Sequence, residues 1–163
     1  KRPVYSCKES WTTMTVSVAD QLEAMLALLL AAALGAVVGL NRESTGRPAG
    51  LRTNMLVAIG AALVMVMARL QFSPDTTGRL ATGVLTGIGF LGGGVIIHRK
   101  SQVQGLTTAA SIWLVAVIGL TVGAQLYLLA AGTTVLSWFV LAVLVRVSRE
   151  IEPEQGDEDE VVD

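Results

Sequence analysis

The sequence predicts an all-α membrane protein, a bundle of about five transmembrane helices. Of the 163 residues, 52% are hydrophobic and only 15% are charged, whereas about 25% of an ordinary soluble domain is charged. The charged residues gather at the chain ends and in short connectors, which leaves long uninterrupted apolar blocks. About 20 apolar residues cross the ~30 Å hydrocarbon core of a bilayer as a helix, and a helix satisfies its own backbone hydrogen bonds there.

Five blocks are apolar enough to be spans, and none holds a charged residue near its middle. The expected spans are residues 22–40, 54–67 with an extension to 70, 80–97, 107–124 and 126–145. A soluble protein with five buried helices would need amphipathic helices to cover them, and no such sequence remains. The expected organisation is a polar segment at 1–20, a transmembrane domain at 21–146 and a tail at 147–163.

The positions of Lys and Arg predict the orientation. The connectors after the first and third spans, together with the C-terminal flank, fall on one side and hold Arg42, Arg47, Arg52, Arg99, Lys100, Arg146 and Arg149. Because basic connectors stay in the cytoplasm, we expect the N-terminus outside and the C-terminus in the cytoplasm. The tail beyond residue 149 is acidic, and such runs are usually disordered and solvated. A cation-binding role is the alternative interpretation of the tail.

Glycines at a spacing of four residues predict helix-packing faces, because small residues let helix backbones approach closely in lipid. The pairs are Gly35 with Gly39, Gly83 with Gly87, and Gly89 with Gly93. These faces could pack within one chain or between chains, so a homo-oligomer is left open. The glycine run 92–94 has a second interpretation, a bend or unwound segment with exposed carbonyls as in transporters.

Polar chemistry is concentrated in the connector 41–53. The simplest interpretation is a positively charged turn that sets the topology. The functional interpretation is an anion or headgroup site built from Arg47 and Arg52. The motif Ala-Gly-Leu-Arg-Thr at 49–53 recurs as Gln-Gly-Leu-Thr-Thr at 104–108. We therefore hypothesise that the first two helices and the next two form a parallel repeat, whose connectors would face each other.

Four segments resemble the signatures of the MgtC/SapB family, in the family's order and spacing over about residues 21–145. They are Gly39-Leu-Asn-Arg-Glu, Gly46-Arg-Pro-Ala-Gly-Leu-Arg-Thr, Gly87-Ile-Gly-Phe-Leu-Gly-Gly-Gly-Val and Gly105-Leu-Thr-Thr-Ala-Ala-Ser-Ile-Trp. The resemblance implies a bacterial inner-membrane protein with five spans, associated with magnesium homeostasis, acclimation to low magnesium and virulence. It places Glu43, Arg47, Arg52, Asp75 and Arg79 at the family's polar signature positions.

The resemblance also implies partners, since at least some family members act by binding and inhibiting the F-type ATP synthase. The best-known virulence members carry a soluble C-terminal domain, where we expect an acidic tail in this chain. The family often has glutamine near the start of the third helix, where Thr82 stands.

These observations favour a regulatory membrane protein that contacts a membrane complex such as ATP synthase, with membrane lipids as its other partners. The alternative is a transporter or channel for magnesium, another cation or a small solute, and a third hypothesis is a lipid-organising bundle. A magnesium conduit would be expected to hold carboxylates within its spans, and this chain has none at mid-membrane. We expect no enzyme, since no nucleophile has a visible base, and no metal site, cofactor or nucleic-acid partner.

Overall fold

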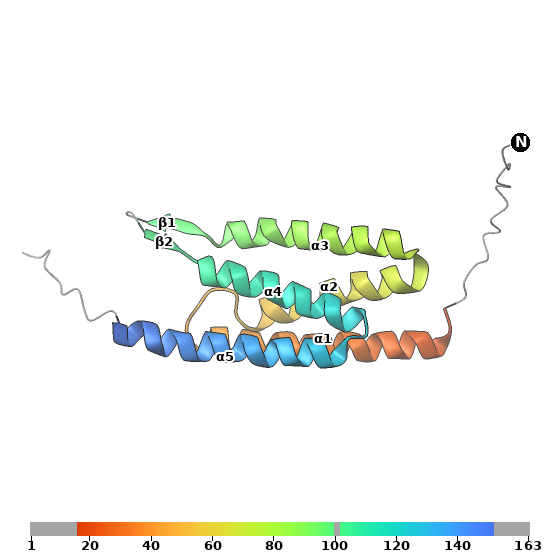
Figure 1. Ribbon diagram of the computed structural model, residues 1–163, viewed down its shortest axis with the longest axis horizontal. Helices are drawn as coiled ribbons and strands as arrows, with labels where there is room; N and C mark the ends of the chain where they lie inside the picture. Colours follow the sequence, from red (N-terminus) through yellow and green to blue (C-terminus); the bar gives the residue numbers. More distant parts are fainter. Residues whose placement is uncertain (1–15, 100–101, 152–163) are drawn as a thin grey trace, which may run out of the picture.

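The computed structural model describes residues 16–99 and 102–151. Five helices and one β-hairpin follow each other as α1 (Val18–Ser44), α2 (Leu51–Gln71), α3 (Pro74–Gly94), β1 (Ile97–Arg99), β2 (Gln102–Gln104), α4 (Leu106–Gly123) and α5 (Tyr127–Ile151). The helices run up and down, with α1, α3 and α5 in one direction and α2 and α4 in the other (Figure 1). The predicted all-α bundle of five helices is confirmed.

Three of the described helices, α1, α2 and α4, are long and apolar enough to cross a membrane by composition alone. In α5 the apolar helical run covers Tyr127–Val143. The helix α3 is long enough but less apolar, because Gly and Thr hold 11 of its 21 positions. The composition of α3 therefore sets it apart from the other four helices.

Local signals explain where two helices begin. The Ser17 hydroxyl accepts a hydrogen bond from the Ala19 N–H, and the Asp20 carboxylate accepts one from the Ser17 N–H, both at 3.0 Å. This capping box starts α1. The helix α3 starts at Pro74, six residues before the predicted residue 80, because proline at the first helical position lacks an N–H that would be unpaired anyway.

The connector after α3 differs from the prediction. The helix ends at Gly94, three residues before the predicted end at 97, and the chain then forms an antiparallel β-hairpin in which Ile97 pairs with Gln104. The hairpin returns the chain to Gly105, whose φ of +93° is a conformation that suits glycine. We predicted only a basic connector in this place.

The core lies between α1, α2 and α4 and is built mainly from small side chains. It includes Ala27, Ala31, Val38, Ala58, Ala62, Val66, Val115, Ile118 and Val122. A Cβ added at Gly35 would stand 2.8 Å from the Asn54 carbonyl oxygen of α2, and one added at Gly123 would stand 2.7 Å from the Ala62 carbonyl oxygen. Such close backbone approach is a main source of helix packing in lipid.

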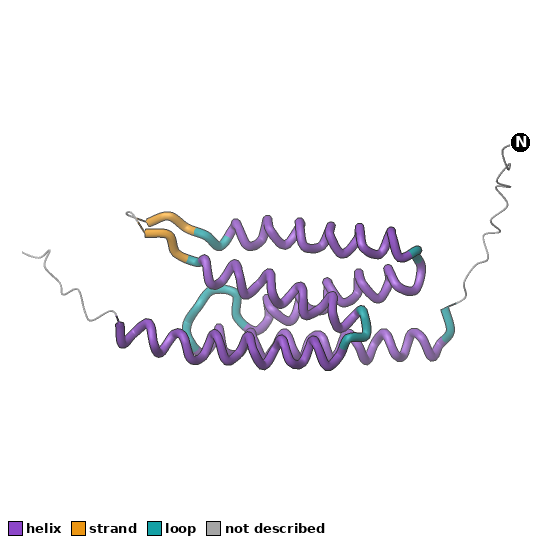
Figure 2. Tube along the Cα trace, viewed as in Figure 1, coloured by secondary structure: helices purple, strands orange, loops and turns teal. Residues whose placement is uncertain are grey.

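The outer helices flank this core. The helix α3 packs on α2 and α4, whereas α5 packs on α1 and α4, and the two lie on opposite sides of the bundle in Figure 1. The α1–α2 loop, the β-hairpin and the end of α5 share one end of the bundle, which we call the hairpin end (Figure 2). The basic connectors therefore share one end of the bundle, which is consistent with their predicted location on one side of the membrane. Which side of the membrane this end faces stays a prediction.

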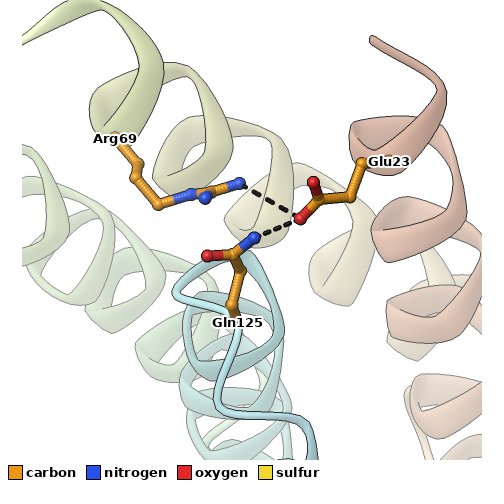
Figure 3. A network of polar contacts seen from close by, with 3 residues as sticks. All are labelled: Glu23, Arg69 and Gln125. Carbon is orange, nitrogen blue, oxygen red and sulfur yellow. Dashed lines mark hydrogen bonds and ion pairs between the residues drawn. The ribbon is translucent and has the colours of Figure 1, made fainter. Parts of the chain in front are cut away.

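A polar network ties the opposite end together (Figure 3). The Glu23 carboxylate accepts a hydrogen bond from the Gln125 side chain and lies 3.9 Å from the Arg69 guanidinium. The network joins α1, α2 and the α4–α5 turn. The side chains of Arg69 and Glu23 are 33% and 49% exposed, so the ion pair contributes about 1 kcal/mol or less.

Two predicted segments, the polar N-terminal segment and the acidic tail, lie at the ends of the chain. The helix α5 runs to Ile151, past residue 147, where we expected the acidic tail to begin. Residues 152–163, and with them most of that tail, lie outside the described residues, as do residues 1–15 of the N-terminal segment.

Candidate functional site

The five predicted binding residues lie at two ends of the bundle. Glu43, Arg47 and Arg52 belong to the hairpin end, in or beside the α1–α2 loop. Asp75 and Arg79 lie in the first turns of α3, at the opposite end. They therefore do not form one site.

Glu43 stabilises the start of α2. Its carboxylate accepts a hydrogen bond from the Leu51 N–H at 2.8 Å, and Gly50, the residue before the helix, offers no side-chain cap of its own. The carboxylate thus satisfies one of the backbone donors that every helix start leaves unpaired. Arg52 is exposed on the first turn of α2.

Arg47 lines a cavity of about 510 Å³ between the α1–α2 loop and the start of α4, which we call the arginine cavity. Its lining consists of Arg42, Arg47, Pro48, Val95, Val103, Gln104, Gly105, Leu106, Thr107 and Thr108. The two connectors that carry the repeated motif thus face each other across this cavity. Whether the two helix pairs form a structural repeat stays a hypothesis.

Arg42 is the buried member of the cavity, with 3% of its surface exposed. Its Nη2 donates to the Thr108 hydroxyl, and Thr108 is itself 2% exposed. Its Nε is buried without a hydrogen-bond partner. We had grouped Arg42 with the basic connector, although it continues the small-residue face of α1 that Gly35 and Val38 define. That periodicity is the signal that could have identified it.

The second candidate surface is the outer side of α3. A Cβ added at Gly78, Gly83 or Gly87 would meet nothing within 4 Å. These glycines line a hollow of about 770 Å³ together with Asp75, Arg79, Thr82 and Thr86. We call these seven residues the α3 face.

The threonine hydroxyls of the α3 face are satisfied within their own helix. The Thr82 and Thr86 hydroxyls donate to the carbonyl oxygens of Gly78 and Thr82 at 3.0 and 2.9 Å. A groove of about 430 Å³ between α2 and α3 adjoins it and shares Gly87. The α3 face therefore offers backbone-close contact to another helix.

The predicted packing glycines differ in their surroundings. Gly35 and Gly39 lie against α2, where an added Cβ would stand 2.8 and 2.7 Å from backbone atoms. The other four, Gly83, Gly87, Gly89 and Gly93, face open space in the described part of the chain, so their role in contacts between chains stays a prediction. The tightest contacts of α4 come from Gly119 and Gly123, a pair we did not single out.

The glycine run 92–94 ends α3 and does not bend it. The helix continues to Gly94, and the carbonyls of Gly92 and Gly93 accept hydrogen bonds from the N–H groups of Val95 and Ile96 at 3.3 and 3.2 Å. The structure therefore shows no unwound segment with free carbonyls at Gly92 and Gly93. Among residues 16–99 and 102–151, no group of three or more His, Cys, Asp or Glu side chains could hold a metal ion.

Comparison with known proteins identifies the family. The MgtC family profile matches residues 28–150. SrpB of Synechococcus elongatus is 41% identical over 145 residues, which cover 80% of this chain and 79% of SrpB. YhiD of Escherichia coli K12, named as a supposed magnesium transporter, is 40% identical over 129 residues, 74% of this chain and 60% of YhiD.

MgtC of Salmonella typhimurium is 46% identical over 112 residues, which cover 69% of this chain and 48% of MgtC. The chain thus spans about half the length of MgtC. No solved structure matches the chain. The family match over most of the chain, together with the apolar bundle, establishes that this membrane protein belongs to the MgtC family.

Proposed function

We propose that the chain is a regulatory protein of the bacterial inner membrane that docks the α3 face against a helix of a larger membrane complex. The observation that supports this most is an uncovered small-residue face on an otherwise tightly packed bundle. The F-type ATP synthase is the partner that the family resemblance favours. Acclimation to low magnesium and virulence are the settings that follow from the same resemblance, and we propose no enzymatic activity.

The two outer helices, α3 and α5, differ in the size of the side chains that they expose. The exposed side of α5 carries large apolar side chains, such as Leu128, Val135 and Leu136 at 91%, 66% and 63% exposure, and these suit contact with lipid tails. The α3 face instead carries three glycines and two threonines, with the charged residues Asp75 and Arg79 in its first turns. Since lipid tails are as apolar as leucine, helices associate in membranes through close packing of small residues. The α3 face is thus better suited to a protein helix than to lipid.

One exposed aromatic residue extends this surface. Phe90, 84% exposed, lies on α3 one turn beyond the α3 face. A large aromatic side chain beside a small-residue face gives a partner helix both a place to approach and a ring to pack on. This combination supports a protein partner for α3.

Magnesium transport is the alternative that the name of YhiD favours. Magnesium is held through carboxylates, usually with several retained waters. Four carboxylate side chains are described by the structure, and they belong to residues at or near helix ends: Asp20, Glu23, Glu43 and Asp75. Because a path across the bilayer centre needs polar groups at depth, the arrangement favours regulation over transport.

The orientation proposed with this function has the hairpin end in the cytoplasm and the N-terminus outside. Its support is the positive-inside rule, by which basic connectors stay in the cytoplasm. The α1–α2 loop places Arg47 at the hairpin end. Anionic lipid headgroups of the cytoplasmic leaflet would be attracted to such a surface.

The test is co-purification from bacterial membranes after extraction in a mild detergent. The variant Gly83→Leu/Gly87→Leu makes the α3 face bulky, and Gly132→Leu is the matched control on α5, because all three positions face open space. We expect wild type and the control to recover ATP synthase subunits and the α3 variant to lose them. Equal recovery by all three proteins would contradict the proposed docking surface.

Flux of magnesium into proteoliposomes distinguishes magnesium transport from the proposed regulatory function. The regulatory proposal expects no flux above that of empty liposomes. Saturable flux that is lost in the Asp75→Asn variant would favour the transporter.

A further inference from the structure

The arginine cavity contains a buried positive charge, that of Arg42, which has no role in the function proposed for the α3 face. Arg42 is 3% exposed, and its Nε is buried without a partner. Its hydrogen bond to the Thr108 hydroxyl supplies a dipole and no negative charge. Burying a cation without a counter-ion costs several kcal/mol, so the cavity favours the entry of an anion.

None of the four carboxylates whose side chains the structure describes, those of Asp20, Glu23, Glu43 and Asp75, pairs with Arg42. The one ion pair found among the described residues joins Arg69 and Glu23, at the opposite end of the bundle. The carboxylate next in sequence, Glu43, accepts from the Leu51 N–H instead. Arg42 therefore has no counter-ion among the side chains that the structure describes.

A second cation lines the same cavity. The backbone N–H of Arg47 donates to the Arg42 carbonyl at 3.0 Å, which folds the α1–α2 loop back onto the end of α1. Both residues line the arginine cavity as a result. Two guanidinium groups on one cavity repel each other unless an anion lies between them, and guanidinium geometry matches phosphate oxygens in particular.

The start of α4 completes the site. Residues Gln104 to Thr108 line the cavity, and Gly105 leaves the helix without a side-chain cap. Among the described residues, no side chain caps the first N–H groups of this 18-residue helix, which starts beside the arginines. A helix N-terminus attracts anions through these groups and through its dipole.

From this geometry we infer that the arginine cavity binds a phosphate group, carried by an anionic lipid headgroup or by inorganic phosphate. Arg42 and Arg47 contact its oxygens from α1 and the α1–α2 loop, and the start of α4 contacts it from the other side. The apolar lining of Pro48, Val95 and Leu106 leaves room for the glycerol part of a lipid. This site is separate from the α3 face and does not depend on the function proposed for it.

The test measures binding of two probes to the full chain. Inorganic phosphate is titrated into protein in a neutral detergent, and nanodiscs of phosphatidylglycerol or phosphatidylcholine supply the lipid, with retained lipid counted by native mass spectrometry. We expect Arg42→Met to weaken binding by about 10- to 100-fold, the usual range for losing a charged hydrogen bond, and Arg47→Gln by about tenfold. The matched control Arg52→Gln, in the same basic loop region but outside the cavity lining, should stay within about twofold.

Binding of inorganic phosphate or of phosphatidylglycerol shows which molecule carries the phosphate group. Binding of either probe supports the site if Arg42→Met and Arg47→Gln weaken it and Arg52→Gln does not. Failure of both probes to bind wild type more tightly than Arg42→Met would overturn it. So would an equal loss in Arg52→Gln, because a diffuse basic surface would then explain the binding. Since Arg47 is exposed, its variant tests the site even if Arg42→Met does not fold.

Stability gives an independent measurement. In detergent free of phosphate and anionic lipid, Arg42→Met should unfold at the same temperature as wild type or at a higher one, because an unpaired buried charge has been removed. Phosphate should then raise the unfolding temperature of wild type alone. A purely structural role for Arg42 predicts the reverse, a less stable variant and no effect of phosphate on wild type.

Discussion

Replacing Gly35 with alanine adds one methyl group where α1 and α2 already touch. The new Cβ would lie 2.8 Å from the Asn54 carbonyl oxygen and 2.9 Å from the Ala58 Cβ. Ordinary van der Waals contact begins at 3.4 Å, so the helices must separate locally by about 0.6 Å, and a gap of this size forfeits a quarter to a half of each contact's attraction. We expect a loss of about 1–3 kcal/mol in the free energy of unfolding, the usual cost of overpacking.

The matched control is Gly132→Ala on α5, where an added Cβ meets nothing within 4 Å. Alanine is the better helix former by about 1 kcal/mol, so this variant should be as stable as wild type or more stable. The assay is reversible unfolding in detergent with a rising fraction of sodium dodecyl sulfate, followed by circular dichroism. If Gly35→Ala proves no less stable than Gly132→Ala, close backbone contact does not hold α1 and α2 together.

Three further predictions concern single contacts and can be measured in the same unfolding assay. Glu43→Ala should cost about 0.5–2 kcal/mol, the range for losing a helix cap, because the Leu51 N–H loses its partner; no measurable change would mean that the carboxylate does not cap α2. Gly105→Ala should cost about 1–3 kcal/mol, because the residue has a φ of +93° and its Cβ would overlap the Val95 carbonyl; a neutral effect would contradict this conformation. Glu23→Gln should change stability by about 1 kcal/mol or less, and a larger loss would show that the network in Figure 3 is more than a surface contact.

The fold could be predicted from the sequence because lipid restricts the choices. Long apolar blocks separated by polar connectors admit few arrangements other than a helix bundle. The packing role of Gly35 and Gly39 was also visible, since small residues four apart have a direct meaning in membrane helices. The four segments that resemble the family signatures lie inside residues 28–150, the region that the family profile matches.

The candidate sites were harder to predict because they depend on contacts between distant segments. Arg42 and Thr108 are 66 residues apart, and nothing local to either residue indicates that they meet. The glycines of α3 and those of α4 follow similar spacings, yet Gly119 is packed against α2 and Gly83 is open. Spacing identifies a face that can pack, whereas only the arrangement of the helices shows which faces are already covered.

Site-specific photo-cross-linking in living cells can detect the proposed contact between the α3 face and another membrane protein. A photoreactive amino acid is placed at position 83 in the α3 face or at position 132 on α5, both of which are open in the bundle. We predict cross-links from position 83 to a subunit of the F-type ATP synthase and none from position 132. Cross-links from position 83 only to lipid or to a second copy of this chain would contradict this prediction.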